Sequence, residues 1–400
     1  MTTCSRDGIY AIPGAGAVPG GEECLKDMRV IQIDTRHRRQ VRQFVELPFR
    51  LYRHLPQWVP ALRSEALSML DPRRNPFFQH SEAAFFIAED EQGAIGRLAI
   101  LNHRPYNAFN NTKTAFFYLF ECENDLPAAR LLFETAFAWA GKRRLTEVVG
   151  PKGFSPLDGM GMLVDGYEHR PALGIPYNLD YYPQLLEALG FSGSGDILSG
   201  YLSASIHFPE RIHQVAQRVS ERRGLRVAQF KRRKDLRAII PQLKELYNLS
   251  IQGTHGNYPV SDADVQAIAD QMLRFADPAL IKIVLKDEQV VGFLFAYPDI
   301  SPALQRAKGR LFPTGWARLL IELRRANWVN INGMGIIKEY RGLGGTALLF
   351  SEMHDSISQR GFEHAELVQI GTENDPMLRE LRSLGVDFYK THRIYLRGLD

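Results

Sequence analysis

Apolar and polar residues along the chain follow patterns that predict strands and helices in mixed order. Strand-like alternation at 84–89 and 94–101, on either side of a polar turn, predicts a β-hairpin. A further strand is expected at 114–122, and apolar residues at helical spacing predict a long helix over 126–142. The strand 147–150 then enters a Gly- and Pro-rich loop. Strands and helices mixed in this way are typical of an α+β fold.

The second half of the chain repeats this order of elements. A hairpin is predicted at 281–286 and 290–297, and a strand at 328–336 leads into a helix that continues to Arg360. Three landmarks recur at nearly one spacing, namely Gly96 and Gly292 (292 − 96 = 196), Asn178 and Asn374 (374 − 178 = 196), and Gly190 and Gly385 (385 − 190 = 195). We interpret the chain as two copies of one unit of roughly 175 residues.

The composition is that of a soluble globular protein, with 45% hydrophobic and 24% charged residues in a chain of 400. That length favours two domains. We expect a disordered leader at 1–27, because this segment is rich in Gly and Pro and has no apolar signal core. A first unit is expected at 28–205, a linker helix at 206–224 and a second unit at 225–400.

Charge and cysteine content exclude several classes of protein. A net charge of +4 is small for this length and does not predict nucleic-acid binding. Cys4, Cys24 and Cys122 cannot make a disulfide framework and lack metal-ligand spacing, so we expect no metal and a reducing, cytoplasmic setting. No apolar run reaches about 18 residues, so no membrane-spanning helix is predicted.

One short segment between a predicted strand and a predicted helix has the character of a phosphate-binding loop. After the strand 328–336, Arg341 is followed by Gly342, Gly344 and Gly345. Glycine lets backbone N–H groups approach a ligand closely, and a helix N-terminus carries a partial positive charge. No Lys follows the glycines, which excludes the P-loop. The dinucleotide fingerprint is matched only weakly, and no βαβ unit follows it.

This segment resembles the acyl-CoA loop of the GNAT superfamily, which reads Q/R-x-x-G-x-G/A between a strand and a helix. Here it is Arg341-x-x-Gly344-x-Thr346, preceded by the aromatic Tyr340, and Thr346 departs from the pattern. The resemblance implies two tandem α+β domains with mixed, mostly antiparallel sheets, flanked by helices, that splay where CoA enters. It also implies that acyl-CoA binds as a co-substrate. The residues expected to bind it are Ile336, Ile337, Arg341, Gly342, Leu343, Gly344, Gly345, Thr346 and Asn374. Helix capping is an equal explanation for Asn374.

The two copies differ at this junction. In the first copy the segment from Glu121 to Asp125 has no glycine and three acids, which would repel a pyrophosphate. We therefore expect only the second copy to bind acyl-CoA. N-myristoyltransferases and Fem-type aminoacyl transferases are tandem GNAT-like proteins with one cofactor site, so the arrangement has a precedent by resemblance.

The catalytic residues are less clear than the loop. In many GNAT enzymes a Tyr protonates the departing thiolate, but Leu381 stands at that position here. Tyr389 is the nearest replacement, and packing at the end of the sheet is its alternative role. Glu373 is a candidate base, or else a solvated loop acid. His255 lies in a Gly-flanked loop between helices, where GNAT enzymes often bind the acceptor.

Two polar clusters in the first copy are candidates for the acceptor side, with surface hydrogen bonding as the alternative. One lies near a predicted sheet edge and consists of His80, Glu82, His103, Tyr106 and Asn107. The other consists of Tyr177, Asn178, Tyr181 and Tyr182, of which we take Tyr177, Asn178 and Tyr182 as substrate-binding candidates.

An insertion between residues 297 and 328 has no counterpart in the first copy. Its helical stripe contains Trp316, Leu319, Leu320 and Leu323, and we also take Trp316 as a substrate-binding candidate. Its charged residues are Arg306, Lys308, Arg310, Arg318, Arg324 and Arg325 against Glu322. A basic amphipathic helix can lie on an anionic membrane surface or cover a channel for an acyl chain, and an ordinary packed helix is the alternative.

The sequence therefore favours an acyl-CoA-dependent N-acyltransferase that acts on an amine, cytoplasmic or peripheral to the inner membrane. The layout resembles an uncharacterised bacterial N-acetyltransferase-like family and is similar to the GNAT-like bacterial ceramide synthases, which acylate a sphingoid base. That similarity would make the acceptor a lipid amine. A catalytically inactive acyl-CoA sensor or scaffold is an alternative because Leu381 replaces the acid. Fem-type aminoacyl transfer is another, although a net charge of +4 gives little support for tRNA binding.

Overall fold

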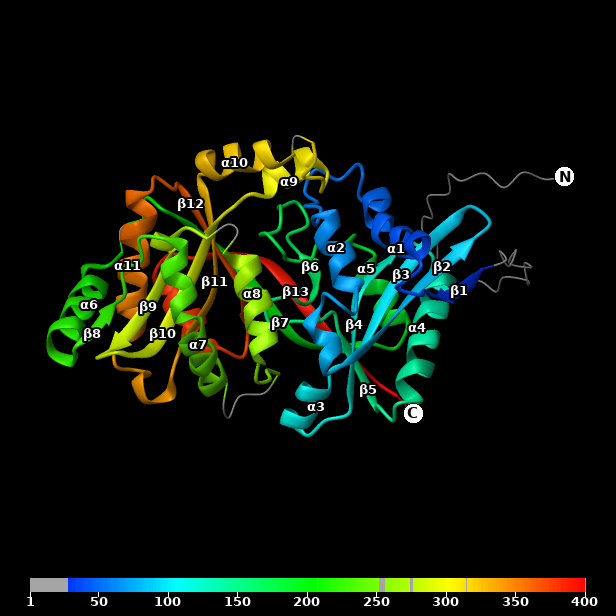
Figure 1. Cartoon of the computed structure of the whole chain (residues 1–400), viewed down its shortest axis with the longest axis horizontal. Coiled ribbons are helices and arrows are strands. Elements are labelled where there is room, and N and C mark those ends of the chain that lie inside the picture. Colours follow the sequence, from blue (N-terminus) through cyan, green and yellow to red (C-terminus); the bar gives the residue numbers. More distant parts are fainter. Residues whose placement is uncertain (1–27, 207, 252–255, 274–275, 314, 400) are drawn as a thin grey trace, which may run out of the picture.

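The computed structural model describes residues 28–206, 208–251, 256–273, 276–313 and 315–399. The leader expected at 1–27 and the candidate His255 lie outside these residues. Figure 1 shows an elongated molecule in which two αβ halves lie side by side, with the C-terminal strand between them.

The first half contains a sheet with helices on both of its faces. Its elements are β1 (Arg29–Gln32), α1 (Arg38–Leu51), α2 (Arg63–Leu70), η1 (Pro76–Gln79), β2 (Glu82–Asp90), β3 (Gly93–Asn102), α3 (Arg104–Asn110), β4 (Thr114–Cys122), α4 (Leu126–Gly141), β5 (Glu147–Gly150), β6 (Met162–Asp165), α5 (Tyr182–Ala188) and β7 (Ser192–Ser203). The predicted strands at 114–122 and 147–150 are confirmed. The loop predicted after β5 contains a short strand, β6. This strand was not predicted, because it has only four residues and lies between two glycines.

The second half repeats these elements and adds a helical hairpin between two of its strands. It contains α6 (Glu210–Arg223), β8 (Leu225–Val227), α7 (Arg233–Ser250), α8 (Asp262–Met272), η2 (Pro278–Leu280), β9 (Ile281–Lys286), β10 (Gln289–Pro298), α9 (Ser301–Ala307), α10 (Gly315–Arg325), β11 (Trp328–Ile336), η3 (Lys338–Tyr340), α11 (Gly345–Gln359), β12 (His364–Gly371), α12 (Asp375–Ser383) and β13 (Asp387–Gly398). The predicted strand 328–336 is confirmed.

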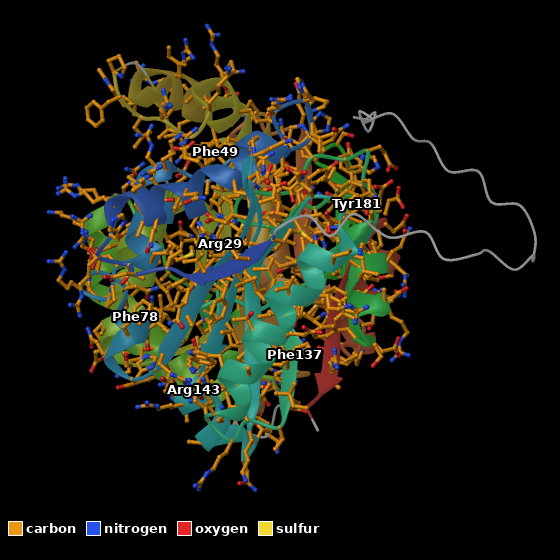
Figure 2. The ribbon with its side chains drawn as sticks, turned by 90° about the vertical axis from the view of Figure 1, so that its right-hand side faces the viewer. Arg29, Phe49, Phe78, Phe137, Arg143 and Tyr181 are labelled. Carbon is orange, nitrogen blue, oxygen red and sulfur yellow. The ribbon has the colours of Figure 1, made fainter. Side chains whose placement is uncertain are left out.

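Each half has its own hydrophobic core. In the first, α4 packs across β2 and β3 with Leu132 and Phe133 fully buried, and each side chain contributes about 1.5–3 kcal/mol by leaving water. In Figure 2, Phe137 on this helix and Arg143 just after its end lie below the edge strand β1. In the second half α11 takes the place of α4, and α6 packs against it.

One continuous sheet joins the halves through an exchange of strands. Its order is β1-β2-β3-β4-β5-β13-β7-β12-β11-β10-β9-β8, with β6 beside β13. The C-terminal strand β13 therefore lies between β5 and β7 of the first half, while β7 pairs with β12 of the second. The boundaries 28–205 and 225–400 remain a prediction, and a cut along the sequence between them would separate β13 from β5.

Both halves contain a pair of parallel strands that diverges. β4 and β5 are paired only through Thr114–Phe116, and β11 and β12 only through Trp328–Ile331, after which the strands separate. The longer strand of each pair has an irregular residue just beyond this point, Leu119 with φ 52° and Gly333 with φ 97°. A positive φ at the same place in both halves agrees with the duplication inferred from the spacings.

Candidate active site

The glycine loop turns the chain from β11 into α11. Two of its glycines have positive φ, 70° at Gly342 and 90° at Gly344, a conformation that L side chains rarely adopt. Gly344 is the N-cap residue of α11, and Gly345 begins the helix. The backbone conformation of the turn itself therefore favours glycine at 342 and 344.

The N-terminus of α11 is left without a side-chain cap. The amides of its first turn have no partner inside the helix, and the helix dipole makes this end favourable for an anion. The corresponding end of α4 is closed, because Asp125 Oδ1 accepts a hydrogen bond from the Ala128 amide at 2.9 Å. The second junction thus offers uncapped backbone donors to a pyrophosphate, whereas at the first junction an acid already accepts from the Ala128 amide.

Packing also explains one of the glycines. A Cβ atom at Gly344 would lie 2.4 Å from Val219 Cγ2 and 3.1 Å from Val215 Cγ1, both on α6. A Cβ atom at Gly342 would meet no atom within 4 Å. Gly344 is therefore needed for the close approach of α6, whether or not a ligand is bound.

Arg341 holds the loop in place. Its Nε donates to the Ile336 carbonyl at 3.0 Å, and its Nη2 donates to the Ser250 carbonyl at the end of α7, also at 3.0 Å. These bonds tie the end of β11 to a neighbouring helix. Ile336 and Ile337 are buried beside the loop, while Thr346 and Leu343 are half-buried. Binding of acyl-CoA by these residues remains a prediction.

The corresponding space in the first half is filled by the protein itself. Glu121, at the end of β4, is held by the hydroxyls of Tyr52 and Tyr182 and by Arg97 at 3.5 Å. The Tyr182 hydroxyl also accepts from the Cys122 amide at 3.0 Å, and the Tyr181 hydroxyl donates to the Cys122 carbonyl at 2.7 Å. Figure 2 shows Tyr181 beside the upper end of α4. These tyrosines occupy the mouth of the first junction, in addition to the acids that the sequence showed there.

A buried polar cluster lies beside the diverging strands of the second half. Glu366 on β12 and Lys390 on β13 form an ion pair of 2.5 Å, and both are almost fully buried. Burial raises the pKa of Glu366 and lowers that of Lys390, while their mutual attraction opposes both shifts. Burial and the nearby Glu366 carboxylate raise the pKa of the Tyr389 hydroxyl.

The segment between β6 and α5 of the first half closes this cluster. The Arg170 carbonyl accepts from Lys390 Nζ at 2.9 Å, and the Arg170 guanidinium pairs with Asp299. The Tyr297 hydroxyl donates to the Leu173 carbonyl at 3.2 Å. Two buried polar atoms beside it, Asn330 Nδ2 and Ser301 Oγ, have no partner among the described residues. Both halves of the chain therefore contribute to this site.

The sequence-derived catalytic candidates lie apart from one another. Tyr389 joins the buried cluster through Glu366, whereas Glu373 is exposed after β12 with its carboxylate folded back over Gly371. Asn374 is the N-cap residue of α12, but its side chain makes no capping bond. Leu381 is buried in the core of the second half. The roles of Tyr389 and Glu373 in catalysis remain predictions.

The other acceptor-side candidates make hydrogen bonds, ion pairs or ring contacts with the rest of the protein. Asn178 is buried and binds the Leu163 backbone, and the Tyr177 hydroxyl donates to the Tyr167 carbonyl. His80 approaches Asp264 of α8 at 3.3 Å, and the His103 ring lies 3.9 Å from that of Tyr258. The remaining members pair within the first half, with Glu82 bound to Arg143, Asn107 to the Thr114 carbonyl and Tyr106 against Phe116. A substrate role for these residues remains a prediction.

Sequence reasoning missed the cluster around Glu366. The available signal was an acid in the middle of an apolar strand, Ala365-Glu366-Leu367-Val368. A charge there is costly unless it is paired, so it indicates a buried partner. Its partner Lys390 is 24 residues further along the chain (390 − 366 = 24), on the C-terminal strand. Local sequence patterns do not identify this pairing.

The described residues contain neither a cluster of metal ligands nor a helix that could span a membrane. Within the ranges that the structure describes, no group of three or more His, Cys, Asp or Glu side chains could hold a metal ion. Among the same residues, no helix is long and apolar enough to cross a membrane.

Two known proteins are similar in sequence to nearly the whole chain. No family model matches the chain. A protein named bacterial ceramide synthase, from Caulobacter vibrioides, is 26% identical over 383 residues, which are 93% of this chain and 98% of that protein. Protein YghO of Escherichia coli is 24% identical over 369 residues, 90% of this chain and 93% of that protein.

Solved structures agree with the architecture. A tandem GNAT protein from the clavulanic acid biosynthesis pathway superposes with a TM-score of 0.55 at 13% identity, over 94% of this chain and 99% of its own. A GCN5-related N-acetyltransferase from Sphaerobacter thermophilus gives 0.50 at 14% identity, over 93% and 96%. The chain thus has a tandem GNAT fold, built from two GNAT-like domains.

Proposed function

We propose that this chain of two GNAT-like domains transfers an acyl group from a CoA thioester to an amine, and that the amine is a long-chain sphingoid base. The observation that carries the proposal is the contrast between the two junctions. The N-terminus of α11 is uncapped and approached through glycines, while the equivalent place in the first half is capped by Asp125 and filled by Tyr182. The named activity of the ceramide synthase relative supports the acceptor class.

The reaction requires two proton movements around one carbonyl carbon. The amine nitrogen attacks the thioester carbonyl, a C–N bond forms and the C–S bond breaks. One proton leaves the nitrogen for a base, and one reaches the sulfur of CoA. We assign the acid to Tyr389. Glu366, whose carboxylate contributes to the raised pKa of Tyr389, is one candidate base, and Glu373 and His255 are the others.

The test uses the full chain with sphinganine and a long-chain acyl-CoA. N-acyl product is measured by mass spectrometry, and free CoA with a thiol reagent. Thr346→Glu places a carboxylate in the first turn of α11, where an acid stabilises the helix but repels a pyrophosphate. We expect it to raise KM for acyl-CoA at least about tenfold with little loss of stability. The uncharged Thr346→Gln is the matched control, and equal KM values for the two variants would contradict the cofactor site.

A second candidate function is the binding of acyl-CoA without catalysis. It is supported by Leu381, which is packed in the core at the position where many GNAT enzymes have their acid. A protein that binds acyl-CoA without turnover would rise in Tm with the thioester and release no thiol with any amine. That outcome would favour a sensor or scaffold. Transfer from aminoacyl-tRNA, with no reaction of acyl-CoA, would favour the Fem-type alternative.

A further inference from the structure

The α9–α10 hairpin presents an apolar surface to solvent. Its inner side packs on the protein, where Leu319 and Leu323 meet a small core formed by Leu62, Ile300 and Leu304. Its outer side exposes four large apolar residues, Phe312 (81%), Trp316 (52%), Leu320 (53%) and Ile321 (50%). These are half of the eight large hydrophobic residues that the described chain exposes, and all four lie between residues 312 and 321, so exposed apolar side chains are concentrated on this hairpin. Figure 1 shows the hairpin along one edge of the molecule.

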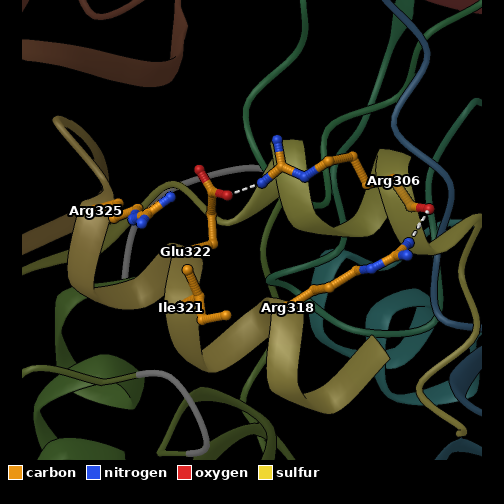
Figure 3. Close-up of a pocket in the computed structure, with 5 residues that line it drawn as sticks. All are labelled: Arg306, Arg318, Ile321, Glu322 and Arg325. Carbon is orange, nitrogen blue, oxygen red and sulfur yellow. Dashed lines mark hydrogen bonds and ion pairs between the residues drawn. The ribbon is translucent and has the colours of Figure 1, made fainter. Parts of the chain in front are cut away.

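The same surface carries an excess of positive charge. The acid of α10, Glu322, is paired with Arg306, and Arg318 donates to the Arg306 carbonyl at 3.0 Å (Figure 3). The charges of Arg324 and Arg325 have no acidic partner among the described residues. They follow directly after the apolar residues of the outer face. The arrangement is an apolar strip with arginines beside it.

We propose that this outer face docks on an anionic phospholipid bilayer. Aromatic and aliphatic side chains would enter the boundary between headgroups and acyl chains, while the arginines pair with lipid phosphates. A basic rim around exposed apolar residues matches such a surface in both hydrophobicity and charge. A purely apolar interface with another protein would leave these guanidinium groups without partners.

The position of the hairpin connects this surface to the buried cluster. Asp299, which pairs with Arg170, lies two residues before α9. The Arg170 carbonyl accepts from Lys390, the partner of Glu366. Docking through the hairpin would therefore bring a bilayer to the side of the second half on which this cluster lies. This step rests on the proposed function, whereas the docking itself does not.

The docking is tested by sedimentation of the full chain with vesicles of phosphatidylcholine alone and of phosphatidylcholine mixed with phosphatidylglycerol. We expect binding to the mixed vesicles, weakened by salt because the attraction is screened. Arg324→Glu/Arg325→Glu should lower the partition coefficient at least about tenfold. Leu320→Ser/Ile321→Ser should lower it similarly without a change in Tm, because both side chains are already half exposed.

Two matched controls define the result. Arg38→Glu/Arg39→Glu reverses an adjacent, exposed arginine pair at the start of α1, and Leu67→Ser replaces an exposed leucine of α2. Both should bind vesicles as the unaltered chain does. Failure of the folded chain to bind mixed vesicles would overturn the proposal, even if the chain transfers acyl groups in solution. So would a dimer that Leu320→Ser/Ile321→Ser dissociates, because a second copy would then cover this face.

Discussion

At the scale of single residues, His103 makes the stability of the fold sensitive to acid. Its ring is buried against Phe77 and Tyr258, and its Nε2 has no partner among the described residues. Burial lowers its pKa to about 3, and the facing His80 and Lys152 act in the same direction, opposed by Asp264. The unfolded chain therefore binds the proton more readily. The contribution of His103 to stability is fully present above about pH 6.5 and is lost as the pH falls towards 3.

His103→Asn tests this reasoning without removing a helix cap. His103 Nδ1 accepts from the Tyr106 amide at the start of α3, a role that Asn performs well. Urea unfolding of the wild type should show a slope of up to about 1.4 kcal/mol per pH unit from this site below pH 6.5. The variant should lose that slope. His37→Asn changes the exposed cap of α1 and should leave the slope as it was. An unchanged slope in His103→Asn would contradict the assignment.

At the scale of elements, the contact between α6 and the glycine loop distinguishes two reasons why a position favours glycine. One is a positive φ, and the other is a lack of space for a Cβ atom. Gly344→Ala meets both a positive φ and a clash with Val219, whereas Gly342→Ala meets only a positive φ. We expect about 1 kcal/mol of destabilisation for Gly342→Ala and about 2–4 kcal/mol for Gly344→Ala in urea unfolding. In Val219→Ala/Gly344→Ala the clash is relieved, so the double variant should be about 1–2 kcal/mol more stable than the sum of the single changes. Additive effects would mean that α6 moves aside freely.

The same elements show what a sequence can and cannot predict. The strands 114–122 and 328–336 were predicted with their observed bounds, because apolar runs between turn residues are a local signal. The glycine loop is also predicted by a local signal, because its glycines are close together in the sequence. The pairing of β13 with β5, and the contact of Lys390 with Glu366, are long-range and leave no periodic trace. The tyrosines that fill the first junction lie just after α1 and at the start of α5. Nothing in the sequence around Tyr52 or Tyr182 indicates that both bind Glu121.

At the scale of the whole molecule, the exchanged strand makes the two halves dependent on each other. β13 lies between β5 and β7, and its Tyr395 is fully buried in the core of the first half. Without β13, both neighbouring strands would expose unpaired backbone groups, which favours aggregation. Residues 28–205 expressed alone should therefore fail to fold cooperatively, although they form one complete copy of the repeat in the sequence.

A fused strand should restore that half. Asp387 pairs with Tyr201, so the end of β7 and the start of β13 lie side by side. A short Gly-rich linker can therefore join residue 205 to residues 387–399 as an antiparallel hairpin. The fusion should give a cooperative urea transition and slow amide exchange in β5, and the unfused half should give neither. A fusion in which Tyr395→Ala empties the core position is the control and should be several kcal/mol less stable. A cooperative transition of the unfused half would show that the exchange joins two domains that each fold alone.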